Sequence, residues 1–176
     1  MVKAVKFFAY FSFFMVILYT MFPKANLFYK AEDVLGTYKI NIMNESLHER
    51  VFSLNAEHFN VAFEGVQTAY VSQAEFMLLG VYNSINIQDI ELSGIVKNFL
   101  PQKIASVYIS YSILHPFTIR AYTKGDFGEA ELSYLLNTKQ ITIKLHPSQL
   151  MLQKYSSSLR EFKKLEGGVY YYETSL

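Results

Sequence analysis

The sequence contains no cysteine and almost no net charge. Without a thiol, the chain has no cysteine nucleophile, no disulfide framework and no thiolate zinc site. The formal net charge of the 176 residues is +1, so no overall positive field draws the protein to nucleic acid, and we expect no nucleic-acid partner. These absences exclude several classes of function and leave the hydrophobic pattern as the main source of information.

One long hydrophobic run, Ala4–Phe22, differs from the rest of the chain and contains Lys6 as its only charge. As a helix rising ~1.5 Å per residue it would cover about 28 Å, close to the hydrocarbon thickness of a bilayer. We predict a membrane anchor over 1–23, a linker over 24–36 and a β-rich domain over 37–176. The anchor residues expected to face lipid are Phe7, Phe8, Phe11, Phe14, Ile17, Leu18 and Phe22.

A cleaved signal peptide is the alternative to a permanent anchor. Cleavage after Ala25 would put Pro23 at the third-last position, and cleavage after Ala31 would put Tyr29 there; neither is a small residue. We therefore expect an uncleaved signal anchor with its N-terminus inside, at the inner (cytoplasmic) membrane, with the C-terminal domain in the periplasm. A buried helix of a soluble protein is disfavoured because the run has eight aromatic residues and no polar face.

The rest of the chain alternates with the period of β-strands. The segment 66–80 is less regular and is interpreted as a strand followed by a short strand or a helical turn. In 85–94 the alternation slips by one residue, which predicts a bulge near Gln88-Asp89. We predict a mainly β fold, an antiparallel and curved meander, with strands near 38–43, 52–54, 59–64, 85–94, 105–113, 117–122, 130–136, 139–145 and 169–174.

One hairpin can be predicted to the register, with its turn at Asn137-Thr138. This turn pairs apolar residues on one face and polar residues on the other, and a shift by one residue would lose the match. The expected pairs are Leu136 with Lys139, Tyr134 with Ile141, Leu132 with Ile143, Ala130 with Leu145, Leu135 with Gln140, Ser133 with Thr142 and Glu131 with Lys144.

Near the C-terminus the period changes to that of a helix. Leucine and aromatic residues recur every three or four positions over 152–165, which predicts one helix ended by Gly167-Gly168. Two starts are open: Ser148 as the cap, or a shorter helix capped by Ser158.

Candidates for chemistry are few. His115 and His146 each precede a proline, and an enzyme would need both histidines beside a carboxylate. Two carboxylate pairs, Glu129 with Glu131 and Asp89 with Glu91, lie at positions expected to face solvent. We predict no enzyme activity, no catalytic or metal site and no cofactor.

The apolar face of the strands needs a covering layer, and the single predicted helix is short. One interpretation is that the sheet folds over itself or under that helix. The other is an open face that contacts lipid or a partner protein, with the candidate residues Val107, Ile109, Ile119, Leu132 and Ile143.

The layout resembles the periplasmic β-rich, single-span proteins related to type II secretion protein N, and more distantly the AsmA-like envelope proteins. The resemblance covers roughly residue 51 to the end and implies an inner-membrane anchor, a β-rich periplasmic domain and a role in secretion machinery or lipid trafficking. By layout alone, the anchored periplasmic component of lipopolysaccharide transport is a further analogue. The motifs that carry the resemblance are Tyr111-Ser112-Ile113, Gly125-Asp126-Phe127-Gly128-Glu129, Leu145-His146-Pro147-Ser148, Leu165-Glu166-Gly167-Gly168 and Tyr170-Tyr171-Tyr172-Glu173.

Two functional hypotheses follow. The first is a non-enzymatic, membrane-anchored envelope protein that serves as an assembly or scaffold component of secretion machinery and joins partners by strand addition. The second is a lipid-binding or lipid-transfer protein that uses the apolar face of an open, curved sheet. The expected partners are the bilayer, envelope proteins and lipids, and the oligomeric state is open.

Overall fold

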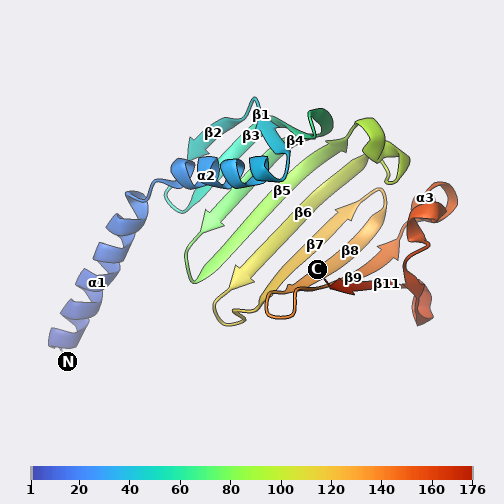
Figure 1. Ribbon diagram of the computed structural model, residues 1–176. Coiled ribbons are helices and arrows are strands. Elements are labelled where there is room, and N and C mark those ends of the chain that lie inside the picture. The colour runs from blue at the N-terminus through green and yellow to red at the C-terminus, as the bar shows by residue number, and fades with distance from the viewer. Residues whose placement is uncertain (1, 176) are drawn as a thin grey trace.

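The computed structural model describes residues 2–175 and is mainly β (Figure 1). An N-terminal apolar helix and a second helix precede one large open sheet. The helices are α1 (Val2–Thr20), α2 (Lys24–Thr37) and α3 (Gln149–Lys154), and the short 3₁₀ turns are η1 (Gly94–Asn98), η2 (Ser156–Leu159) and η3 (Glu166–Gly168). The strands are β1 (Ile40–Met43), β2 (Ser46–Glu49), β3 (Ser53–Phe63), β4 (Val66–Leu78), β5 (Tyr82–Leu92), β6 (Lys103–Ser112), β7 (Thr118–Gly125), β8 (Gly128–Leu135), β9 (Gln140–Pro147), β10 (Lys163–Lys164) and β11 (Tyr170–Ser175).

The eleven strands form a single antiparallel sheet in the order β1-β3-β4-β5-β6-β7-β8-β9-β11-β10. The short strand β2 pairs with the same edge of β3 as β1 does, at the other end of that strand. The predicted mainly β class and the closing strand near the C-terminus are therefore confirmed. The predicted curvature is wrong, because the sheet is open and not strongly curled. The segment 66–80 is also simpler than expected, since one continuous strand, β4, occupies most of it.

The strands give the sheet two ends. Antiparallel pairing places the connections 50–52, 79–81, 113–117 and 136–139 at one end, which we call the proximal end. The connections 64–65, 93–102 and 126–127 lie at the other, the distal end. The C-terminal end of α1 packs at the proximal end, where the rings of Tyr19 and Phe52 are 5.6 Å apart.

The register of the β8–β9 hairpin is as predicted. Six of the seven expected pairs are present, from Leu135 opposite Gln140 to Ala130 opposite Leu145. The seventh, Leu136 with Lys139, falls within the turn, where the Leu136 amide donates to the carbonyl of Phe117 instead. The hydrophobic pattern alone determines this register, because the Asn137-Thr138 dipeptide is a weaker turn former than Asn-Gly.

An irregularity does lie at Asp89, as predicted, but it is not a simple extra residue. Asp89 has a positive φ of 51°, and His58 on β3 has one of 54°. Ser72 and Asp89 lie opposite each other but are not paired. The register between β4 and β5 is nevertheless the same before and after this point, with Val71 opposite Ile90 and Gln73 opposite Gln88. Neighbouring strands are irregular at the same level, and Ile87 and Ile90 consequently contribute to one apolar cluster.

Residues 24–36, expected to be a linker, form helix α2, which covers part of the sheet (Figure 1). Phe28 is 7% exposed and its ring lies edge-on to that of Phe76 at 5.5 Å. It joins the first core, whose members on β3, β4 and β5 include Leu54 and Ile90. The segment predicted as a linker is therefore a helix that packs on the sheet, because the half of the sheet beneath Phe28 needs an apolar cover.

The predicted C-terminal helix is wrong beyond its first turns. Ser148 caps α3 as one of the two predicted starts, accepting a hydrogen bond from the Met151 amide at 3.1 Å. The helix ends at Lys154, where Tyr155 leaves helical geometry and three poor helix formers, 156–158, follow. Met151 and the η2 residue Leu159 pack into the second core, with Phe127 and Leu145.

Candidate functional site

An apolar groove of about 660 Å³ lies on the face of the sheet formed by β6 to β9. Its volume is in the range of about 300–1,000 Å³ that is usual for small-molecule sites. All five residues predicted for a lipid or partner face line this groove: Val107, Ile109, Ile119, Leu132 and Ile143. Each of the five is only half-buried, so the C-terminal segment, whose Met151 and Phe162 line the same hollow, does not bury them fully.

The groove floor consists of cross-strand rows of side chains. The central row runs without a polar break from Leu54 on β3 to Tyr172 on β11. At ~4.8 Å between strands, these eight strands span about 34 Å. The residues of the row, in order across the sheet, are Leu54, Phe76, Ile85, Ile109, Ala121, Leu132, Ile143 and Tyr172.

Small side chains create the hollow in the middle of the floor. Ala121 and Thr123 alternate on β7, and Ala130 lies directly opposite Thr123 on β8. Larger residues surround them, including Ile109 on β6 and Ile143 on β9. The difference in side-chain size leaves space that another apolar group can fill.

The two ends of the groove differ. The second core closes the distal end, where Phe127 and Met151 line the hollow. At the proximal end the lining residues Ile119, Tyr134 and Ile141 do not belong to that core. The groove is therefore closed distally and accessible from the proximal end.

Sequence reasoning missed the residues that form the distal wall. Phe127 was named only within the motif Gly125-Asp126-Phe127-Gly128-Glu129, and Met151 lies one residue before the helical stripe 152–165. Ile104 was placed outside the alternating face of 105–113, but a register shift beside Ala105 brings it to the same side as Val107. A bulge such as the one beside Ala105 has only a weak sequence signal. The contacts that a turn residue such as Phe127 makes with distant parts of the chain have none.

The opposite face of the same strands is polar. A smaller hollow of about 400 Å³ lies there, and its side chains include Tyr108, Arg120 and Lys144. At the distal side of this face, Lys124 Nζ lies 2.9 Å from Glu129 Oε1. The hydrogen bond from Lys124, with a second from Tyr122, lowers the pKa of the Glu129 carboxyl.

This polar face has no arrangement typical of acid–base catalysis. A general acid needs a carboxyl whose pKa is raised toward neutrality, and that of Glu129 changes in the opposite direction. Glu131 faces Lys144 across the strands, as predicted. Both carboxylates are at positions open to solvent, in agreement with the expected solvated face.

His115 and His146, which an enzyme would need side by side, lie at opposite ends of the sheet. His146 pairs with Glu129 at the distal side of the sheet, whereas His115 follows β6 in a proximal connection. Antiparallel order places the ends of β6 and β9 at opposite ends of the sheet. Among residues 2–175 no group of three or more histidine and carboxylate side chains is placed to hold a metal ion.

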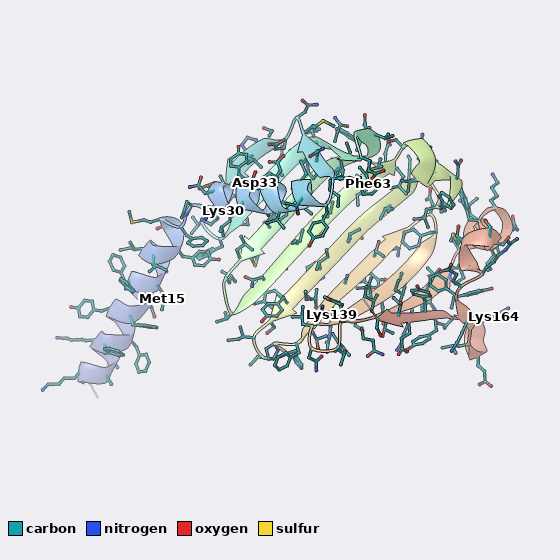
Figure 2. All side chains as sticks on the ribbon, in the orientation of Figure 1. Met15, Lys30, Asp33, Phe63, Lys139 and Lys164 are labelled. Atoms are coloured by element: carbon teal, nitrogen blue, oxygen red, sulfur yellow. The ribbon has the colours of Figure 1, made fainter. Side chains whose placement is uncertain are left out.

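The predicted anchor residues lie on or just after α1. Within the described chain, α1 is the one helix that is long and apolar enough to cross a membrane, and its side chains make no core (Figure 2). Such a helix fits both a signal anchor and a signal sequence. The exposed fractions are 65% for Phe7, 66% for Phe8, 47% for Phe11, 57% for Phe14, 40% for Ile17, 50% for Leu18 and 38% for Phe22.

Comparison of the chain with protein-family models, with curated proteins and with solved structures finds no match.

Proposed function

We propose that this protein binds the acyl chains of membrane lipids in its apolar groove while α1 holds it at the bilayer. The observation that carries the proposal is the half-open hollow of about 660 Å³ on β6 to β9, lined almost entirely by apolar side chains. Each CH₂ group removed from water there contributes about 0.8 kcal/mol. An apolar helix at the N-terminus of the same chain supplies a reason for lipid to be the nearest apolar ligand.

The location is part of this proposal. We infer a single-pass inner-membrane protein with its sheet domain in the periplasm, where lipid acyl chains are available beside the anchor. A role in lipid trafficking is compatible with the resemblance to envelope proteins given above. The proposal does not require a cofactor or a catalytic group.

The scaffold hypothesis has less support from the geometry. Strand addition needs a free sheet edge of useful length. Here β1 and β2 have four residues each and β10 has two. Short edge strands are a common means of preventing strand addition. The remaining free edge is Tyr172–Ser175 on β11.

The test uses a phospholipid with a photoactivatable group in its acyl chain. The full-length protein is reconstituted in vesicles that contain this lipid, irradiated, and mapped by mass spectrometry. We expect crosslinks on floor peptides that contain Ile109, Leu132 and Ile143. Crosslinks confined to α1, or to a second copy of the chain, would contradict the proposal.

A matched pair of variants makes the test specific for the groove. Ala121→Trp puts an indole into the hollow, and Ser133→Trp puts the same ring on the polar face of the next strand. If the indole displaces about two methylene groups, floor crosslinking in Ala121→Trp falls about tenfold. Ser133→Trp retains the crosslinking of the unmodified protein. Equal loss in both variants would show that the groove is not the binding site.

A further inference from the structure

Large apolar side chains gather on the connections at the proximal end of the sheet. The most exposed is Leu114, at 83%, followed by Phe117 at 59%, Val81 at 58% and Ile113 at 52%. They belong to the β4–β5 and β6–β7 connections, which are neighbours in the sheet. A row of such side chains on adjacent connections differs from the single apolar residues scattered over most protein surfaces.

These connections are ordered and joined to each other by backbone hydrogen bonds. The amide of Ile113 donates to the carbonyl of Val81 at 3.1 Å, and the amide of Leu136 donates to that of Phe117 at 2.9 Å. Their backbone groups are therefore partly satisfied within the protein. This lowers the cost of bringing the connections close to hydrocarbon, where unpaired polar groups are unfavourable.

The end of α1 is fixed at the same end of the sheet. The Lys24 side chain is 2% exposed, and its Nζ donates to the carbonyl oxygen of Tyr19 at 3.3 Å and more weakly to that of Phe22. The amide of Ala25 donates to Glu49 Oε1 at 2.8 Å. A cation at the C-terminus of α1 and a carboxylate at the N-terminus of α2 are favourable for both helices. The junction therefore sets where α1 leaves the domain, on the side of the proximal connections (Figure 1).

Basic side chains lie beside the apolar ones. Arg50 and Lys139 are exposed on the first and last of the proximal connections. Figure 2 places Lys139 in the β8–β9 turn, away from Phe63 at the distal end. Basic residues next to exposed apolar residues are suited to a surface of anionic lipid headgroups.

We propose that the apolar rim, defined as Phe52, Val81, Ile113, Leu114, Phe117 and Leu136, inserts into the surface of the bilayer that α1 crosses. The sheet then stands on the membrane with its proximal end down, and the groove residues Ile119, Tyr134 and Ile141 open toward the lipid. This inference rests on the proposed bilayer anchoring by α1, but not on the presence of lipid in the groove.

The absence of cysteine allows a direct test with single-cysteine variants of the full chain. Leu114→Cys, Phe117→Cys, Phe99→Cys and Phe11→Cys are each labelled with an environment-sensitive fluorophore and reconstituted in vesicles of phosphatidylcholine and phosphatidylglycerol. A second set of vesicles also contains a lipid that carries a quencher in its acyl chain. Phe99 is the matched control, since it is 57% exposed at the distal end and Phe117 is 59% exposed at the proximal end.

We expect probes at Leu114 and Phe117 to shift to shorter wavelength and to lose most of their emission to the quencher, as the probe on α1 does. The probe at Phe99 retains its emission. Quenching at Phe11 but not at Leu114 or Phe117 would overturn the rim insertion while leaving the anchor intact. Absence of quenching at Phe11 would overturn both the bilayer anchoring by α1 and the rim insertion. Adding Ala121→Trp separates the two proposals, because it blocks the groove and leaves rim quenching unchanged.

Discussion

The two halves of the sheet present the same apolar face in different states. On β3 to β5 the face is closed by α2, and residues such as Leu54 and Ala74 are at most 1% exposed. On β6 to β9 the corresponding rows continue, yet Ile109 and Leu132 are only half-buried. One continuous apolar surface is thus a protein core in one half and a groove in the other.

The difference follows from the size of the cover. A helix is about 10 Å across and covers about two strands spaced ~4.8 Å apart. Ten strands lie side by side in this sheet, so α2 leaves much of the face without a partner layer. The second core covers the distal corner with α3 and η2. The uncovered remainder is where a ligand can replace a missing layer.

The largest effect is expected at the cover of the closed half. Phe28→Ala removes the ring that packs on Phe76 and should lower the free energy of unfolding by about 3–5 kcal/mol. Its counterpart, Phe162→Ala, removes a half-buried ring that lies 5.4 Å from Tyr172, and should cost about 1 kcal/mol. Urea unfolding followed by circular dichroism in one detergent measures both values.

This pair tests whether the two halves differ in stability as they differ in cover. Equal losses for the two phenylalanines would show that the second half is closed as firmly as the first. A larger loss for Phe162→Ala would reverse the comparison. Either result would remove the physical basis of the open groove.

A second pair of substitutions compares turns in the two halves. Gly128, at the start of β8, has a φ of 117°, and a Cβ there would overlap the carbonyl oxygen of His146. Gly65, in the β3–β4 turn, has a φ of 79° with open space around it. We expect Gly65→Ala to cost about 1 kcal/mol from backbone strain alone, and Gly128→Ala about 2–3 kcal/mol.

The same unfolding measurement distinguishes these outcomes. Gly128→Ala should also perturb the β8–β9 pairing and therefore the groove floor, which acyl-chain crosslinking would detect. If the two alanine variants are equally stable, the close approach between β8 and β9 is absent in solution.

The alternation of apolar and polar residues was sufficient to predict those features that depend only on residues close together in the sequence. Alternation predicted the β8–β9 register and the five groove residues, because residues i and i+2 share a face of a strand. Ser148 was one of two possible caps, and the residues after it could not decide the length of α3. The alternation could not show whether the sheet is curved, since the shape of a sheet is the sum of small twists over many strands.

The cover of the sheet could not be predicted because it is a long-range contact. The residues around Phe28 include three charged side chains in 30–33, which reads as a polar linker. The fully buried partners that make that phenylalanine a core residue, from Leu54 onward, lie 26 or more positions later in the chain. The irregularity at Asp89 was predicted from the slip in the alternation of 85–94. The matching interruption of the pairing at Ser72, on the neighbouring strand, has no sequence signal.

The smallest expected effect concerns the solvent-facing side of the open half. The hydrogen bond from Lys124 is the main cause of the lowered pKa of Glu129, and that from Tyr122 is the next. Because the pKa is lower in the folded protein, the stabilisation is present above the ordinary value of 4.5 and is lost as the pH falls through the lowered value. Lys124→Met should return the pKa of Glu129 toward its ordinary value, and Tyr122→Phe should do so to a smaller degree.

Carboxyl chemical shifts recorded against pH in the isotopically labelled protein measure these pKa changes. Lys124 and Glu129 are both substantially exposed, at 60% and 45%, so the change in unfolding free energy should be slight. It should also vanish at a pH below the lowered pKa, where Glu129 is protonated in the folded and unfolded states alike. An unchanged pKa in Lys124→Met would mean that the ion pair does not persist in solution. A large loss of stability would instead mean that this pair helps to hold β7 to β8. The stability of the open half would then depend on its polar face as well as on its apolar floor.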